Sequence, residues 1–125
     1  MSSFSDAELT YLAKGRFGRL ATIDADGLPH VVPLGWSYNA ELDTIDVGGR
    51  DFAHTRKFHN VQDNPNVALV VDDVLPTWRP RCVLIRGQAQ ALDDAHGPDA
   101  NALGPIIRIT PSQVISWGMD AVDEP

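Results

Sequence analysis

Apolar and polar residues alternate over most of the chain, and this pattern predicts β-strands. The clearest case is Arg81–Leu92, where Val83, Ile85, Gly87, Ala89 and Ala91 alternate with Arg86, Gln88 and Gln90. Such alternation is typical of a strand with one buried face, and the unbroken apolar run Val67–Val71 is typical of a fully buried strand. Four more segments have strand character, the last interrupted at Thr110-Pro111: 16–23, 28–38, 44–48 and 106–119. The pattern predicts about six strands.

Helical spacing replaces this alternation in two short segments. Ser5-Asp-Ala-Glu8 has the form of a capping box and is followed by apolar residues at helical spacing up to Gly15. An N-terminal helix is therefore expected there. A second, mid-chain helix is expected from about Phe52 to Gln62, ending at Asp63-Asn-Pro-Asn66.

Short turns join most of the predicted strands. Asp24-Ala-Asp-Gly27 is a hairpin signal, a turn is expected over 39–43, and 74–80 and 93–104 are expected to be loops. Pro29 and Pro33 fall inside the segment 28–38, so this strand is expected at a sheet edge, at a bulge or beside a ligand. Together these signals favour a mainly-β, six-stranded antiparallel barrel over a parallel sheet, as a single domain over residues 1–125.

Charge and composition exclude several classes of partner. The 125 residues carry a formal net charge of -7, which argues against binding to nucleic acid or to an anionic membrane surface. Cys82 is the single cysteine, so no intrachain disulfide can form and a reducing cytoplasm is expected. The chain shows neither a basic, apolar leader nor an apolar run of roughly 20 residues. A cytoplasmic protein is the expectation.

No residue pattern typical of unaided catalysis or of a metal site stands out. His54 and His59 are five positions apart, which does not suit two ligands on one helical face, so no metal site is predicted. Cys82 is expected to be a small buried residue. Asp72 and Asp73 would point to opposite faces of a strand and are expected to end it. No acid or base is assigned, and His30 is the nearest candidate.

The adjacent basic residues Arg56 and Lys57 lie near the start of the mid-chain helix. Helix N-termini carry unpaired backbone N–H groups that favour anions, and two cations there would complete a phosphate cradle. A solvated helix face is the alternative. Gly48-Gly49, which permits a close backbone approach, and the apolar strands before it favour the cradle.

Several motifs in order resemble one protein family. The run 18–33, GRLATIDADGLPHVVP, is similar to the first hairpin of the pyridoxamine-phosphate-oxidase-like split β-barrel flavoproteins. The run 55–65, TRKFHNVQDNP, is similar to their phosphate-binding segment. The segments 67–73, 78–81, 85–87 and 114–118 resemble an actinobacterial branch assigned to the deazaflavin coenzyme F-420. The resemblance covers roughly residues 4 to 119.

The resemblance implies a homodimer with two cofactor sites at the interface. It implies that a flavin-type ring lies along His30, Val31, Val32, Pro33 and Leu34. It places the cofactor phosphate at Thr55, Arg56 and Lys57, with Arg50 reaching the cofactor tail. Trp36, Trp78 and Trp117 would line the substrate pocket or fill the dimer interface.

The function implied is an oxidoreductase that binds coenzyme F-420 and passes a hydride to or from a small organic substrate. Alternatives are an FMN-dependent enzyme of the same family, a non-catalytic cofactor carrier, or a barrel that serves only as an interaction module. Vitamin B6 oxidation is not expected, because the acidic tail 120–125 stands where the true oxidases carry basic residues for their phosphorylated substrate. His54 stands where the branch often has a basic residue.

Overall fold

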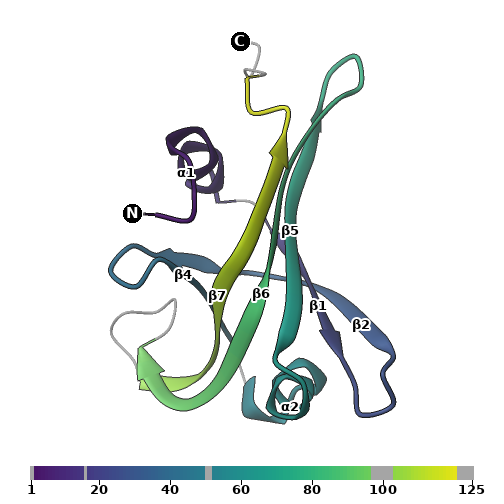
Figure 1. The fold of residues 1–125 in the computed structure, drawn as a ribbon, viewed down its shortest axis with the longest axis vertical. Helices are drawn as coiled ribbons and strands as arrows, with labels where there is room; N and C mark the ends of the chain where they lie inside the picture. The colour runs from purple at the N-terminus through teal and green to yellow at the C-terminus, as the bar shows by residue number, and fades with distance from the viewer. Residues whose placement is uncertain (1, 16, 50–51, 97–102, 121–125) are drawn as a thin grey trace.

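The computed structural model describes residues 2–15, 17–49, 52–96 and 103–120 (Figure 1). Within these ranges, seven strands form one sheet in which every pairing is antiparallel. The strands are β1 Gly18–Ile23, β2 Pro29–Leu34, β3 Ser37–Asn39, β4 Thr44–Gly48, β5 Asn66–Leu75, β6 Arg79–His96 and β7 Leu103–Trp117. The helices are α1 Asp6–Leu12, the short 3-10 helix η1 Phe52–His54, and α2 Arg56–Asp63. The predicted mainly-β antiparallel fold is confirmed.

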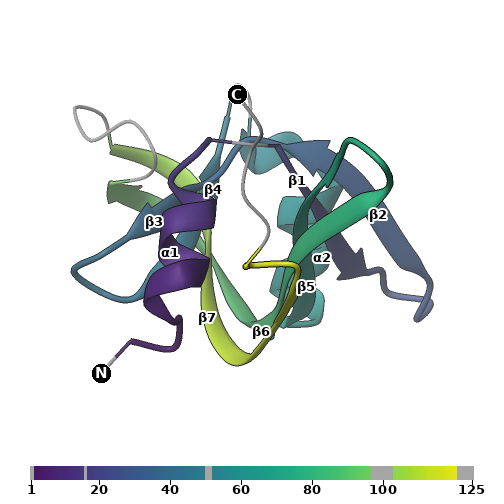
Figure 2. The same ribbon diagram turned by 90° about the horizontal axis from the view of Figure 1, so that it is seen from above.

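The two edge strands of the sheet are joined by a two-residue link but do not pair. Its strand order is β2-β1-β5-β6-β7-β4-β3, so β2 and β3 are its two edges, yet only Gly35-Trp36 separates them in sequence. Because each residue spans at most about 3.6 Å, the two edges approach each other at this link. The strands curve around the interior as a result (Figure 2). The prediction of one strand over 28–38 is wrong, and the described residues form seven strands, because the chain changes edges at Gly35.

Inward-pointing side chains from five strands form the core. Leu20, Ile45, Leu69, Ile85 and Ile107 have no exposed surface. The alternation predicted for β6 is confirmed, since Val83 and Ala89 are buried whereas Arg86, Gln88 and Gln90 are exposed.

Polar contacts fix α1 against the strands. The predicted capping box is present, with Ser5 as the N-cap and Glu8 closing the pair. The other Glu8 oxygen accepts a hydrogen bond from Ser116 at 2.5 Å. The Tyr11 hydroxyl donates to Asp73 at 2.8 Å, and Asp73 also accepts two hydrogen bonds from the buried guanidinium of Arg81. Asp72 and Asp73 therefore lie within β5 and do not end it as predicted.

The mid-chain helix is shorter than predicted. The segment 52–62 is divided by Thr55, whose extended backbone (φ -79°, ψ 153°) separates η1 from α2. Thr55 is the N-cap of α2, and its side-chain oxygen accepts a hydrogen bond from the backbone N–H of Phe58. The α-helix therefore begins at Arg56, within the basic pair.

The predicted loops are also shorter, because the strands extend into them. β5 continues to Leu75 and β6 begins at Arg79, so the loop expected over 74–80 is a tight hairpin in which Thr77 and Trp78 have positive φ values of 62° and 57°. β6 continues through residue 96, and residues 97–102 lie outside the described ranges.

The interruption predicted at Thr110-Pro111 is a bulge inside a continuous β7. Arg86 pairs with Gln113 and Gly87 with Pro111, so Ser112 is the extra residue. A methyl group on Gly87 would lie 2.2 Å from the Thr110 carbonyl oxygen, which explains why glycine stands opposite the bulge.

Candidate functional site

The strand predicted to lie along the cofactor ring has two different faces. Paired residues of neighbouring strands lie on the same face of a sheet, and His30 and Leu34 pair with Thr22 and Gly18. His30, Val32 and Leu34 therefore point to the core side and are half-buried. Pro29, Val31 and Pro33 point outward and are exposed. Residues 30–34 cannot all present their side chains to one ligand.

The backbone of β2 offers one hydrogen-bond donor between its two prolines. Asp24 donates its N–H to the Leu28 carbonyl at 2.9 Å, so residues 24 and 28 form a hydrogen-bonded pair. Hydrogen-bonded and non-hydrogen-bonded pairs alternate along an antiparallel ladder, so Val31, opposite Ala21, is in a non-hydrogen-bonded pair and its N–H points away from β1. Pro29 and Pro33 occupy the other positions of β2 at which an N–H would point away from β1, but proline has no N–H. Because β2 is a sheet edge, the Val31 N–H faces outward along that edge.

The outward side of strands β2, β1, β5, β6 and β7, here called the outer face, is largely apolar. Pairing places its residues in cross-strand rows. One row contains Pro33, Arg19, Val70, Leu84 and Ile115, and its neighbours contain Asp72, Cys82 and Trp117 on one side and Val31, Ala21, Ala68, Arg86 and Gln113 on the other. Val31 is 60% exposed and Trp117 50% exposed. Exposed apolar patches of this kind mark interaction sites.

The first turn of α2 holds the predicted basic pair in two different environments. Arg56 is exposed, whereas the Lys57 ammonium lies 5.0 Å from the centre of the Phe52 ring. Partial burial lowers the pKa of Lys57 from its ordinary value. The first backbone N–H groups of an α-helix have no partner within the helix. Thr55 caps the Phe58 N–H, so the N–H groups of Arg56 and Lys57 are the first-turn donors that would face an anion beside these two cations.

The Thr55 hydroxyl forms hydrogen bonds within the chain. Its hydroxyl donates to the Phe52 carbonyl at 2.7 Å and accepts from the Phe58 N–H at 3.4 Å. In this arrangement its proton is already engaged. An anion at the α2 start would meet the backbone N–H groups and the side chains of Arg56 and Lys57.

The two predicted cofactor segments are connected through β1. His30 lies opposite Thr22, and the Thr22 hydroxyl accepts a hydrogen bond from Asn60 of α2 at 3.0 Å. Asn60 is one helical turn after Arg56, and both Thr22 and Asn60 are buried. The sequence analysis missed this pair, which carries no local signal. His30 Nδ1 is buried and has no hydrogen-bond partner among the described residues.

The three predicted pocket tryptophans do not gather in one place. Trp36 packs at the edge-to-edge link beside Gly18, where a methyl group would lie 3.0 Å from its ring. Trp78 is 80% exposed in the β5–β6 turn, and Trp117 belongs to the outer face. Arg50, predicted to reach the cofactor tail, lies outside the described residues.

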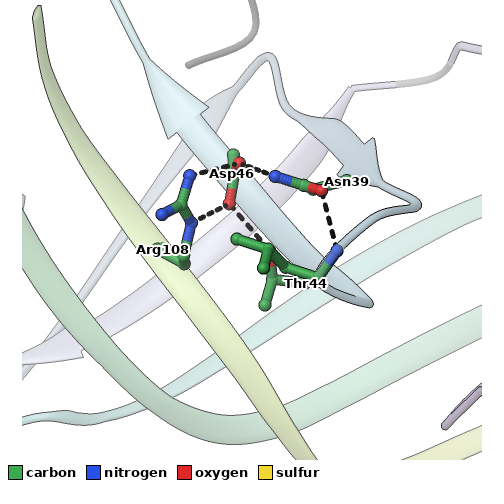
Figure 3. Close-up of polar contacts among 5 residues, drawn as sticks. Asn39, Thr44, Asp46 and Arg108 are labelled. Atoms are coloured by element: carbon green, nitrogen blue, oxygen red, sulfur yellow. Dashed lines mark hydrogen bonds and ion pairs between the residues drawn. The ribbon is translucent and has the colours of Figure 1, made fainter. Parts of the chain in front are cut away.

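A second polar cluster, centred on Asp46 of β4, was also missed by the sequence analysis (Figure 3). The Asp46 carboxylate is buried and accepts two hydrogen bonds from Arg108 at 3.1 Å, and one each from Thr44 and Asn39 at 3.0 Å. These contacts join β3, β4 and β7. With four donors already bound, this carboxylate anchors the β3 edge and is not arranged for chemistry.

Two depressions in the surface of the described residues lie near the β7 bulge. One of about 380 Å³ follows the β7 bulge and is lined by Pro65, Gln88, Ala89, Gln90, Thr110 and Ser112. It includes none of the predicted cofactor residues. In the described part of the chain, no three His, Cys, Asp or Glu residues gather as metal ligands would. Nor is any described helix long and apolar enough to cross a membrane.

Comparison with known proteins identifies the family. A model of the family described as pyridoxamine 5'-phosphate oxidase matches residues 4–118. The chain belongs to this family. The family predicted from the sequence motifs is thereby confirmed.

Individual relatives agree with this assignment. A 5a,11a-dehydrotetracycline/5a,11a-dehydrooxytetracycline reductase of Streptomyces rimosus is 42% identical over 94% of this chain and 84% of its own length. This relative confirms the prediction of an oxidoreductase.

Two solved structures share the fold at lower identity. A conserved hypothetical protein of Mycobacterium tuberculosis has a TM-score of 0.74 at 20% identity, covering 94% of this chain and 86% of that one. An F-420 reductase has a TM-score of 0.61 at 20% identity, covering 81% of this chain and 90% of that one. These likenesses establish the split-barrel fold.

Proposed function

We propose that the protein binds coenzyme F-420 and transfers a hydride to a conjugated ring compound. The observation that carries this proposal is the start of α2, where Arg56 and Lys57 lie in the first helical turn. The Asn60–Thr22 contact ties this helix to β1, the strand that pairs with β2. A phosphate would bind at the α2 start. When bound, the deazaflavin supplies the hydride and both electrons.

The chain's own residues bind and orient the cofactor and exclude water. Arg56 and Lys57 would hold the phosphate by charge-assisted hydrogen bonds, with Thr55 fixing the helix start and Arg50 nearby in sequence. The Val31 N–H would bond a polar atom of the ring, while the outward surfaces of Val31 and Pro33 would contact its face. This holds the ring in one orientation and surrounds it with apolar atoms.

A second copy of the chain would complete the site. The outer face leaves Val31, Val74, Ile115 and Trp117 between 37% and 60% exposed, which is unusual for a monomer. The predicted site has an apolar wall on one side only. We therefore infer a homodimer in which each outer face covers the other and the ring lies between them.

The substrate inferred from the relative is a polycyclic ring compound with a conjugated enone. The Streptomyces rimosus enzyme is named for dehydrotetracyclines. Trp117, on the outer face, is the predicted pocket residue best placed to pack on a flat ring, whereas Trp36 packs within the barrel. The buried, unpaired thiol of Cys82 fits a reducing cytoplasm.

FMN is the alternative cofactor, because it also joins a phosphate to a flat ring. Titrating the protein with coenzyme F-420 and with FMN, followed by absorbance and fluorescence, separates the two. Arg56→Ala/Lys57→Ala should weaken binding of the preferred cofactor on the order of a hundredfold or more, since each of the two charge-assisted contacts contributes about 1.5–3 kcal/mol.

The control is His59→Ala, an exposed residue of the same helix. Equal cofactor affinity in the double variant and in His59→Ala would refute the phosphate site. If cofactor binds but an enone never reoxidises its reduced form faster than free solution does, the protein is a carrier.

A further inference from the structure

Arg19 and Asp72 form an ion pair on the outer face. Arg19 pairs with Val70 of β5, and Asp72 lies two residues further along that strand, so the two side chains meet diagonally across β1 and β5. The Arg19 side chain is 51% exposed and that of Asp72 42% exposed. Exposed pairs of this kind contribute only about 0–1 kcal/mol to stability, so the fold does not depend on this pair.

The surroundings of this pair are apolar on both sides. Along its row, Arg19 lies between Pro33 of the edge strand and Val70, followed by Leu84 and Ile115. Asp72 pairs with Cys82, which in turn pairs with Trp117. Burial raises the pKa of the Cys82 thiol, and the nearby Asp72 charge adds to this. The carboxylate therefore lies close to the thiol.

The Arg19 guanidinium can donate hydrogen bonds to an oxygen at the edge of a flat molecule. A guanidinium carries five N–H donors in one plane, and one Arg19 nitrogen is bound to Asp72. Asp72 thus fixes the plane of the guanidinium while other donors remain for a ligand. In the proposed dimer, a planar ring held between the two outer faces and resting on Val70 and Leu84 would have its rim beside Arg19.

We propose that Arg19, oriented by Asp72, binds the enolate or phenolate oxygen of a planar ring substrate whose rings pack against Trp117. The inference rests on the proposed function and names its substrate class: ring compounds that carry an enone conjugated to an enol or phenol. Arg19 is then a specificity-determining residue beside the β2 strand.

When the oxygen beside Arg19 is the carbonyl oxygen of the enone, the contact also stabilises the charge that develops on it during reduction. Addition of a hydride to the β-carbon of an enone moves the carbon–carbon π pair toward the carbonyl, whose oxygen becomes an enolate. A reduced deazaflavin, when bound, would supply the hydride with both electrons, and a proton from solvent at the α-carbon would complete the saturated ketone. A guanidinium beside the oxygen favours the enolate over the neutral enone.

Binding of two matched probes to the cofactor-free protein tests this without turnover. 4-Hydroxycoumarin is a flat β-dicarbonyl that ionises to an enolate, and 4-methoxycoumarin has the same rings but cannot ionise. Isothermal titration calorimetry at neutral pH should show tighter binding of 4-hydroxycoumarin by the parent. Arg19→Gln should weaken it about tenfold or more and change the affinity for 4-methoxycoumarin less than about twofold.

Arg86→Gln is the control, because Arg86 is the other cation in these rows of the outer face and hydrogen-bonds to Gln113. It should leave both affinities unchanged. Arg19→Lys, which keeps the charge but loses the planar fork, should fall between Arg19→Gln and the parent. Equal binding of the two probes by the parent, or equal effects of Arg19→Gln and Arg86→Gln, would overturn the proposal.

Two further measurements test the Arg19 site separately from cofactor binding and from dimer formation. Coenzyme F-420 affinity should be the same in Arg19→Gln and in the parent, so failure of the parent to bind F-420 refutes the proposed function and not the enolate site. Sedimentation should show the same oligomer for both. A loss of dimer in Arg19→Gln without loss of enolate selectivity would assign the pair to the interface and overturn the substrate role.

Discussion

Asn60 of α2 donates a side-chain N–H to the hydroxyl of Thr22 in β1 at 3.0 Å, and both residues are buried. This bond fixes the helix that carries Arg56 and Lys57 to the strand that pairs with β2. This contact joins residues 38 positions apart and, with the buried Phe58 and Val61 of the same helix, sets the relative position of the two proposed cofactor segments.

Replacing Asn60 should affect both folding and binding. Asn60→Ala leaves the Thr22 hydroxyl without this donor, and we expect a loss of about 1–3 kcal/mol in the free energy of unfolding, measured by denaturant titration. The α2 start would also be held less firmly, so coenzyme F-420 affinity should fall. Gln62→Ala, an exposed change in the same helix, should do neither. Identical unfolding of the two variants would contradict the role given to this bond.

The Asp46–Arg108 pair should matter more for stability than the Arg19–Asp72 pair. Asp46→Ala removes the carboxylate from a buried cluster that includes the Arg108 guanidinium, which should cost on the order of 3 kcal/mol. Asp72→Ala breaks an exposed pair and should cost less than about 1 kcal/mol. Chemical denaturation of both variants compares them, and equal losses would show that burial is not the deciding difference.

Asp43 should make stability depend on acid pH. Burial alone would raise its pKa, but hydrogen bonds from Tyr38, Ser3 and Ser2 outweigh this and hold the pKa at about 2. A depressed folded-state pKa stabilises the protein above the unfolded value of 3.8 and is lost as pH falls through about 2. Asp43→Asn should therefore unfold at lower denaturant than the parent at pH 7.

The difference between Asp43→Asn and the parent should shrink between pH 4 and pH 2. Glu41→Gln, in the same turn and exposed, serves as the control. A difference that stays constant over this range would mean that the carboxylate charge is not what the turn requires.

Gly87 should tolerate no side chain. A methyl group there would lie 2.2 Å from the backbone oxygen of Thr110, so Gly87→Ala must displace β7 at its bulge. Gly104→Ala is the matched control in a strand, since nothing lies within 4 Å of its added carbon. Thermal unfolding should show a lower midpoint for Gly87→Ala alone. Equal midpoints would show that the bulge adapts freely.

Charging the outer face should break the proposed dimer. Ile115 is 37% exposed at the end of a row that otherwise contains mostly apolar residues, and Ile115→Lys would place an ammonium within the interface. Sedimentation velocity should show dissociation. Leu42→Lys introduces the same charge at an exposed apolar residue of the β3–β4 turn and should remain dimeric. A parent that sediments as a monomer would refute the interface itself.

Local signals predicted the local structure well. The Ser5–Glu8 capping box, the hairpin turn after Ile23 and the alternation in β6 are all present, because each depends on neighbouring residues alone. The segment 28–38 was misread as one strand because its apolar pattern continues through Gly35. No residue in this segment indicates that β2 pairs with β1 whereas β3 pairs with β4.

Long-range polar pairs were beyond the reach of the sequence pattern. Asp46 and Arg108 are 62 positions apart, and a lone buried carboxylate looks like any surface aspartate until its partner is known. The Val67–Val71 run predicted burial on both sides, yet Ala68 and Val70 are half-buried in the single chain. The run is explained if another subunit covers that side.

The absence of β2–β3 pairing in the described sheet has a consequence for recognition. If β2 paired with β3, the main-chain N–H of Val31 would donate to that strand and could not bind a ligand. Because only a short covalent bridge, Gly35-Trp36, joins those edges, a rigid strand keeps one amide directed outward between two prolines. The unpaired β2 edge thus leaves a backbone N–H donor available, which a fully closed barrel would not have.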